Sequence, residues 1–475
     1  MRKGFRSSTR TLKRSSPGIR TGPLGKKLAS ETPLSQYVSK NPPFFVIFLV
    51  VFAIMVLVGA SLLCLPQARA PGQPPTAFHD ALFTAASGVS CTGLVVLDTS
   101  VHWSFFGQAV ILALVQLGGL AFMLTSAFLL IVLGKRVGLL DFRFSDALDA
   151  SSRPACIKFA LQTIALIILF EGLGFLLLYN RFSTLLPAEN SLWNAVFHSI
   201  SAFNNAGFST LSGHNAEVFF HDDFMLLTLS ALIILGGISA PVLINVLANG
   251  RWGSLNINSK IALSFTLGLL VVGTVGILAM EYGNSLGPLS VTQKIMHSFF
   301  YSASSRTAGF SSLNLGVFGF HSLVLVMILM FIGGVAGSTT GGIKVNSFAI
   351  LLLTMRSYIM GYSHVHAFGK QIPEERVHEA ITVFALSIMV ICFPVLILAF
   401  TENLPKLDLL FESTSAFGTV GLSTGITSSL TVAGRLVIAA AMFIGKLAPL
   451  TIVLAISERR RSKEVFQPEE KVRVA

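Results

Sequence analysis

Long apolar runs alternate with shorter ones along this chain, and polar breaks separate them. Residues 43–65 form the first long run, which as a helix rising 1.5 Å per residue would cross the roughly 30 Å hydrocarbon core of a bilayer. A break bounded by prolines follows at 66–75, and the next apolar run, 78–87, is too short to span. Residues 101–133 are again long enough. This pattern predicts a span, a re-entrant helix that enters the membrane and turns back, a loop and a second span.

The same order of elements is predicted three more times. The further long runs are 157–179, 224–247, 261–280, the segment from 321 onward, 380–400 and 436–456, and the further short runs are 192–203, 291–304 and 407–417. We therefore predict an all-α polytopic membrane protein with eight spans and four re-entrant loops. Its expected parts are an N-terminal tail at 1–42, pore repeats at 43–136, 137–251, 252–370 and 371–457, and a C-terminal tail at 458–475.

A glycine follows each predicted re-entrant helix. The four glycines are Gly93, Gly207, Gly309 and Gly421. Ten residues before each stands a phenylalanine and six before stands a small residue, namely Phe83, Phe197, Phe299 and Phe411, and Ser87, Ser201, Ala303 and Ser415. Repetition at matched offsets indicates four copies of one unit, in a pseudo-fourfold arrangement around one path.

The glycine loops carry the predicted chemistry. Irregular backbone at membrane depth is tolerated only where it is buried in protein or lines a water-filled path. For one loop alone, close helix packing would explain the glycine, but fourfold recurrence favours a ring of carbonyls that replaces the hydration shell of a cation. No carboxylate ring accompanies the glycines, which favours a monovalent cation over calcium or magnesium. The predicted filter residues are Cys91, Thr92, Gly93, Asn205, Ala206, Gly207, Thr307, Ala308, Gly309, Thr419, Val420 and Gly421.

A glycine-rich run lies where the second span of the third repeat should be continuous. Because each glycine costs about 0.8–1 kcal/mol relative to alanine in a helix, the run 333–342 predicts a break near mid-membrane and a mobile barrier below the filter. The alternative is a small-residue packing face with GxxxG spacing. A phosphate loop is excluded because no Gly-Lys-Ser/Thr ending is present. The predicted gate residues are Gly333, Gly334, Gly337, Ser338, Thr339, Thr340, Gly341 and Gly342, with Lys446 from the last span.

Two ionisable residues, Glu171 and Lys446, lie deep in predicted spans, where charge is costly and marks function by default, and a third, Arg306, lies in a glycine loop. Lys446 either pins the gate run through an acid or raises a barrier to cations. For Glu171, neutralisation by a neighbouring helix and a part in transport are equally open. Arg306 would repel a cation, so we expect it to point away from the path and pair with an acid behind its loop.

Composition supports the membrane assignment and excludes other classes. A chain that is 53% hydrophobic and 12% charged cannot cover a soluble core. The net charge of +12 is concentrated in tails and alternate connections, which predicts cytoplasmic termini near anionic lipid in the plasma membrane rather than a nucleic-acid site. An organellar transit peptide is the weaker reading of the serine-rich start. No nucleophile–base pair or metal-ligand cluster can be assembled from spacing, so we predict no enzyme and no organic cofactor.

Taken together, these residues resemble the Trk/Ktr/HKT superfamily of potassium transporters, and most closely the KtrB-type subunits of bacterial Ktr systems. The resemblance covers about residues 40–460. Its motifs are the loops at 203–208 and 306–310, the run 333–344 and the segment 442–451. It implies that the four glycines are filter glycines, that 333–342 is an intramembrane gating loop, and that the cargo is potassium, because Gly93 stands where sodium-transporting members have serine.

The resemblance also implies a homodimer with one pore per subunit, seated on a cytosolic nucleotide-binding regulatory ring similar to KtrA or TrkA. The chain departs from the family where Lys446 and its neighbours replace the usual Arg-x-Gly-Pro, which affects the tightness of gating. The alternatives are a sodium-permeable pore of the same fold and, from another class, a secondary transporter of an organic solute. The driving force stays open between the membrane potential and coupled sodium.

Overall fold

The computed structural model describes residues 44–137, 153–185, 188–211 and 222–459. The predicted N-terminal tail and nearly all of the C-terminal tail lie outside these residues. The chain from Val51 onward forms one compact unit, and the unit that ends at Val50 contributes only the beginning of helix α2 to the described part. All packing discussed below lies within the unit that begins at Val51.

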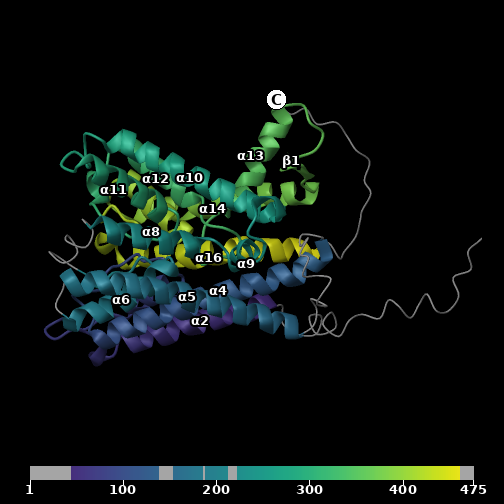
Figure 1. Cartoon of the computed structure of the whole chain (residues 1–475). Helices are drawn as coiled ribbons and strands as arrows, with labels where there is room; N and C mark the ends of the chain where they lie inside the picture. The colour runs from purple at the N-terminus through teal and green to yellow at the C-terminus, as the bar shows by residue number, and fades with distance from the viewer. Residues whose placement is uncertain (1–43, 138–152, 186–187, 212–221, 460–475) are drawn as a thin grey trace, which may run out of the picture. The chain divides into compact units, whose positions relative to one another are not determined.

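Helices make almost all of the described structure (Figure 1). A long helix, a short helix, a glycine loop and one or two further helices follow one another four times along the chain. These helices are α2 (Phe44–Leu63), α3 (Phe78–Val89) and α4 (Phe105–Val137); α5 (Arg153–Leu185), α6 (Ala188–Phe203), α8 (Asp223–Gly237) and α9 (Ala240–Asn249); α10 (Ile257–Glu281), α11 (Val291–Ser304), α12 (Phe320–Phe331) and α13 (Val345–Ile359); and α14 (Glu374–Thr401), α15 (Lys406–Gly418) and α16 (Val432–Arg459). Strands β1 (His366–Ala367) and β2 (Lys370–Gln371) form a small antiparallel hairpin before α14.

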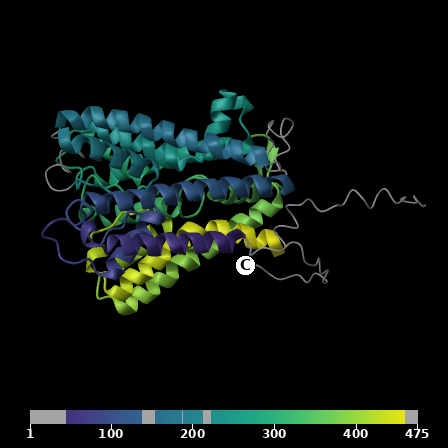
Figure 2. The ribbon, with the colours of Figure 1, turned by 90° about the horizontal axis from the view of Figure 1, so that it is seen from below.

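The short helices pack against the long helices on either side of them. Helix α6 contacts α5 and α8, and α11 contacts α10. Helices α4, α5 and α6 lie side by side (Figure 1), and so do α14 and α16 (Figure 2). Each short helix is therefore enclosed by protein along much of its length, as a re-entrant segment must be.

Four described helices are long and apolar enough to cross a membrane. The number rises to five if the bent pair α8 and α9 is one broken span, and α2, α12 and α13 are shorter apolar helices. A helical architecture with several candidate membrane spans is thus confirmed, whereas the full set of eight spans stays a prediction.

The second repeat contains a break that the sequence pattern did not predict. The run 224–247 was expected to be one helix, but α8 ends at Gly237 and α9 leaves at 98° to it. Pro241 lies in the first turn of α9, where its missing N–H costs nothing. The expectation of a continuous span was wrong because Gly236, Gly237 and this proline interrupt a stretch whose hydropathy is uninterrupted.

The predicted break in the third repeat is confirmed. Helix α12 ends at Phe331, and α13 begins only at Val345. Between them, Ile332 and Ile343 form an isolated parallel bridge, and Gly337 and Gly342 adopt left-handed backbone conformations. The run 332–344 is therefore a folded loop, which we call the glycine-rich loop, rather than a packing face on a continuous helix.

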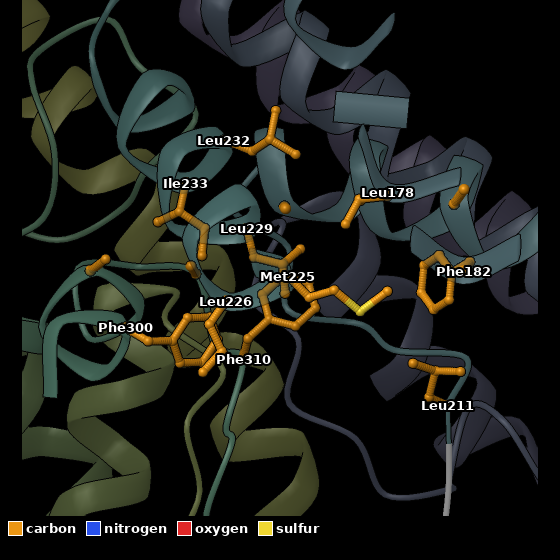
Figure 3. Packing of buried hydrophobic residues seen from close by; sticks show 14 of the residues in the cluster. Leu178, Phe182, Leu211, Met225, Leu226, Leu229, Leu232, Ile233, Phe300 and Phe310 are labelled. Carbon is orange, nitrogen blue, oxygen red and sulfur yellow. The ribbon is translucent and has the colours of Figure 1, made fainter. Parts of the chain in front are cut away.

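A buried aromatic cluster fixes the second and third short helices relative to α8. Figure 3 shows Phe300 and Phe310 facing Leu226, with Met225 and Leu229 beside them, and all five are almost fully buried. Phe299, which the spacing singled out, is only partly buried. The third repeat therefore places Phe300, one residue later, where the other repeats have Phe83, Phe197 and Phe411.

Candidate functional site

The four glycine loops meet at one place and contact each other in cyclic order. A Cβ on Gly93 would lie 2.3 Å from the Ala206 carbonyl oxygen, and one on Gly207 would lie 2.7 Å from that of Ala308. A Cβ on Gly309 would lie 2.3 Å from the Val420 oxygen, and one on Gly421 would lie 2.0 Å from the Thr92 oxygen, which closes the circle. Each carbonyl belongs to the residue just before the next glycine. We call this arrangement the carbonyl ring.

The backbone repeats the same unusual conformation in all four loops. Each ring glycine has a positive φ, and so does the residue two positions before it: Cys91, Asn205, Thr307 and Thr419, with φ between 47° and 79°. Left-handed conformations are rare for residues other than glycine and persist only where the surroundings over-determine them. Substitution of a ring glycine is therefore disfavoured for two reasons, the positive φ and the lack of room for a Cβ.

The loops are tied to the ends of their short helices. The amides of Thr92, Ala206 and Val420 each donate to the carbonyl five residues earlier, that of Ser87, Ser201 and Ser415, at 2.8 Å. In the third loop the Ala308 amide donates to Ser304, four residues earlier, at 2.9 Å. This loop is one residue shorter. Ser304, rather than the Ala303 that the spacing indicated, therefore takes the anchoring position.

A second tie holds the chain as it leaves the ring. A side chain on the short helix bonds the serine two residues after the glycine: His198 Nε2 lies 2.9 Å from Ser209 Oγ, and Tyr301 Oη lies 2.8 Å from Ser311 Oγ. In the fourth repeat, Ser423 Oγ donates to the Glu412 carboxylate. A histidine, a tyrosine and a glutamate thus each bond the serine that follows the ring glycine of their own repeat.

Sequence reasoning missed three glycines that seat the loops on the following helices. A Cβ on Gly118, Gly236 or Gly445 would lie 1.8–2.1 Å from the carbonyl oxygen of Val89, Phe203 or Phe417. Each of these carbonyls belongs to the fourth residue before a ring glycine. The sequence did contain a signal for them. In each of these three repeats, a glycine in the second span follows the ring glycine by a similar number of residues.

The glycine-rich loop contacts two of the ring loops and the bend of α8. The side-chain amide of Asn205 lies 3.1 Å from Thr339 Oγ1. A Cβ on Gly341 would lie 2.4 Å from Thr419 Oγ1. The amide of Val335 donates to the Gly237 carbonyl at 2.9 Å. The predicted gate residues are therefore adjacent to the ring.

Two buried lysines, Lys446 of α16 and Lys344 at the end of the loop itself, bond carbonyls of this loop. Lys446 Nζ donates to the Thr339 carbonyl and Lys344 Nζ to the neighbouring Thr340 carbonyl. Both ammonium groups lie over the ring of Phe122 in α4, at 5.1 Å and 5.3 Å from its centre. Of the two expectations for Lys446, pinning the loop fits this geometry, although the contact goes to backbone carbonyls and not through an acid.

Arg306 does not pair with an acid in the described part of the chain. Its guanidinium donates to the Thr266 carbonyl oxygen at 3.2 Å and lies 3.5 Å from Thr266 Oγ1, both on α10. The expectation that Arg306 points away from the path agrees with these contacts, whereas the expected carboxylate partner is not found among the described residues. Glu171 in α5 lies behind the second loop, where it bonds the amides of Gln116 and Asn204.

Residues 47–467 match the family model described as "TrkH: Cation transport protein". The match covers far more than half of the chain and includes all four ring loops and the glycine-rich loop. This chain belongs to the TrkH family. It is therefore an integral membrane protein of a cation transport family, which is not a family of enzymes.

Individual relatives support the assignment to this family. The chain is 36% identical to the Ktr system potassium uptake protein B of Bacillus subtilis over 86% of this chain and 92% of that protein. It is 34% identical to the potassium/sodium uptake protein NtpJ of Enterococcus hirae over 89% and 95% of the two chains. The crystal structure of the potassium transporter TrkH from Vibrio parahaemolyticus superposes with a TM-score of 0.68 at 18% identity, over 88% of this chain and 85% of that one. The last comparison supports the fold alone.

Proposed function

We propose that this chain is the ion-translocating subunit of a Trk/Ktr-type potassium uptake system. The observation that carries the proposal is the closed carbonyl ring, in which each of four loops, far apart in sequence, presents one carbonyl oxygen to its neighbour's glycine. In this proposal, the four pore repeats surround one path in pseudo-fourfold fashion, and their long helices complete eight spans.

Potassium selection follows from the chemistry of such a ring. Backbone carbonyls replace the water that the cation sheds, and their number and field strength decide which monovalent cation is dehydrated at least cost. The helix ties and the glycine seats keep the four oxygens from relaxing individually. The residues that we assign to the filter are those of the four loops, from Cys91 to Gly93 and their counterparts.

The glycine-rich loop is proposed as the gate of this path. Every residue of this loop except Ala336 is buried; the loop contacts the ring through Asn205, and Lys344 and Lys446 bond two of its carbonyls. Because most of its contacts are single hydrogen bonds rather than helix packing, the loop can exchange them for others when it moves. Displacement of this loop would open the path below the ring.

The wider assembly is proposed from the family and from charge. The relatives named as Ktr system proteins belong, by that name, to systems of several components. We propose a homodimer in the plasma membrane, with both termini cytoplasmic, in contact with lipid and with a cytosolic nucleotide-binding ring similar to KtrA or TrkA. Potassium is the proposed cargo, driven either by the membrane potential alone or by coupled sodium.

A sodium-permeable pore is the second candidate. It is favoured by the relative from Enterococcus hirae, which is named a potassium/sodium uptake protein. The two candidates share the carbonyl ring and differ in how strongly sodium competes for it.

Rubidium uptake into proteoliposomes that contain the purified full chain tests the proposal. Excess potassium should abolish uptake, and excess sodium or lithium should leave most of it. Equal competition by sodium would establish the second candidate. Absence of uptake, both in the natural chain and in a variant that lacks residues 333–342, would overturn the proposal of an ion path.

A further inference from the structure

Three polar side chains from three different elements meet behind the second ring loop. Asn204 Nδ2 donates to Glu171 Oε1 at 2.9 Å and to Gln116 Oε1 at 2.8 Å. Gln116 Nε2 donates to Glu171 Oε2 at 3.1 Å. Asn204 is 1% exposed and follows the last residue of α6, while Gln116 and Glu171 lie in α4 and α5. We call this group the Glu171 cluster.

Both carboxylate oxygens of Glu171 are engaged by amides in this arrangement. One oxygen of Glu171 accepts from the asparagine amide and the other from the glutamine amide. Asn204 Oδ1 is packed against Gly119, where a Cβ would come within 2.0 Å of it. The site is built to fit the amide, because α4 provides both a hydrogen-bonding glutamine and, three residues later, a glycine without a side chain.

Within the part of the chain that the structure describes, no carboxylate supports the other ring loops at this position. Three residues before each ring glycine stand Ser90, Asn204, Arg306 and Gly418. The Ser90 hydroxyl bonds within its own helix end and loop, with Ala86 O and Thr92 Oγ1 at 2.6 Å and with Ser87 O at 3.2 Å. Arg306 bonds Thr266, and Gly418 has no side chain. The second loop is thus the one among these four that is held by a carboxylate in the span behind it.

Asn204, the residue that the Glu171 cluster holds, is followed along the chain by one residue that contacts the glycine-rich loop and one that belongs to the ring. Asn205 follows Asn204, has a φ of 53°, and places its side chain 3.1 Å from Thr339. Ala206 follows in turn, and its carbonyl oxygen abuts Gly93 in the ring. The residue that contacts the glycine-rich loop is therefore the next one after Asn204, and the residue that supplies the ring oxygen is the second one after it.

We propose that Glu171 is a positioning residue for ion selection. By orienting Asn204 it fixes the Ala206 carbonyl in the ring and the Asn205 contact with the glycine-rich loop, so that the ring keeps the dimensions suited to a dehydrated potassium ion. This inference rests on the proposed function. Glu171 does not touch the ion and acts through Asn204.

Glu171→Gln is the direct test. It keeps the shape of the side chain but replaces one acceptor oxygen by an NH2 group, which then faces the NH2 group of Gln116 or Asn204. The purified full chain is reconstituted, and rubidium uptake is measured against graded potassium and sodium. The preference for potassium over sodium should fall by about three- to tenfold, the range through which residues outside a site modulate it. Leu173→Ala, on an exposed position of the same helix, should leave the ratio unchanged.

The exchange variant E171Q/N204D separates positioning from simple damage. It returns a carboxylate and an amide to facing positions with the charge moved to the loop, and it should recover a large part of the lost preference. Gln116→Leu, which removes one partner without changing charge, should lower the preference as Glu171→Gln does. If Glu171→Gln does not fold, Gln116→Leu decides the proposal by the same ratio.

The outcomes distinguish this inference from the proposed function. If the natural chain shows no potassium-competed rubidium uptake, the proposed function fails first. If the natural chain discriminates and the folded variants discriminate equally well, the function stands and the positioning role is overturned. A lower total uptake in Glu171→Gln with an unchanged ratio would also overturn it, because that is the signature of a merely structural residue.

Discussion

The side-chain amide of Asn205 and the hydroxyl of Thr339 lie 3.1 Å apart, which joins the second ring loop to the glycine-rich loop. When the amide oxygen faces Thr339, it also accepts from the Gly237 amide at 3.2 Å, and the amide nitrogen donates to the Ile233 carbonyl at 3.2 Å. One side chain thus connects the ring, the bend of α8 and the proposed gate. If the glycine-rich loop moves, either the contact between Asn205 and Thr339 breaks or Asn205, a residue of the proposed filter, moves with the loop.

Thr339→Val should therefore raise rubidium uptake in the absence of any regulatory partner. The substitution removes the hydroxyl and leaves the Asn205 amide without this partner, so the closed arrangement loses stability relative to the open one. Combined with Asn205→Ala, it should show a coupling free energy of about 0.5–3 kcal/mol, as expected for residues in one hydrogen-bond network.

The matched control is Thr354→Val in α13, where the hydroxyl donates only to the Ile350 carbonyl of its own helix. This variant should transport as the natural chain does. Strict additivity of Asn205→Ala and Thr339→Val would show that the observed contact does not couple the two loops.

Lys446→Met should also weaken the closed state. The Lys446 ammonium donates to the Thr339 carbonyl and lies over the Phe122 ring, so its loss releases the middle of the glycine-rich loop. A hydrogen bond to a charged group is worth about 1.5–3 kcal/mol, which corresponds to a rise in basal uptake of roughly ten- to a hundredfold if it forms only when the loop is closed. Lys406→Met removes an exposed lysine that bonds the Ala399 carbonyl and should change nothing. Equal basal uptake in the two variants would show that Lys446 does not stabilise the closed state.

Gly236→Ala should be among the most damaging conservative substitutions in the chain. The new Cβ would lie 1.8 Å from the Phe203 carbonyl oxygen, which is backbone and cannot swing away. We expect a loss of upwards of about 3 kcal/mol in unfolding free energy, at the top of the usual cost of overpacking. Gly172→Ala, at a helical position with nothing within 4 Å, should instead be neutral or stabilise by about 0.5–1 kcal/mol. Thermal unfolding in detergent ranks the two, and a reversed order would contradict the described seat of the second loop.

Arg306→Lys should destabilise the third loop although the charge is kept. The guanidinium reaches the Thr266 carbonyl from a fully enclosed position, and a lysine cannot reproduce its planar fork of donors. We expect a loss of about 1–3 kcal/mol, measured by thermal unfolding. Arg356→Lys, near the end of α13, is the control that should leave the melting temperature unchanged. A stable Arg306→Lys variant would mean that the observed bonds contribute little.

The sequence predicted best those features that are determined locally. The bounds of α11 agree with the predicted run 291–304, because a capping box of Ser290 and Gln293 starts the helix and the polar residues after Ser304 end it. The break between Phe331 and Val345 was predictable from glycine content alone. The glycines that turned out to form the ring were found because their offsets repeat.

Features that depend on contacts between distant segments could not be predicted. The bend at Gly237 is stabilised by the amide of Val335, which is far away in sequence, and hydropathy contains no trace of it. The third loop is one residue shorter, so its anchoring positions are Phe300 and Ser304. The sequence comparison missed this shift because it assumed the same offset from the glycine in every repeat. The partners of Glu171 come from two other helices, so the choice between neutralisation and function was open until those helices were placed.

The measurement that tests the central claim most directly compares single serine substitutions at the four ring glycines, Gly93, Gly207, Gly309 and Gly421. Each purified variant that folds is reconstituted, and the ratio of potassium to sodium competition against rubidium uptake is determined. If the four loops form one filter, every substitution lowers the same ratio, since each places a side chain against a carbonyl or glycine of the next loop. If the glycines serve only helix packing, the variants will differ in yield and stability while the ratio stays that of the natural chain, and the carbonyl ring is then not the selective element.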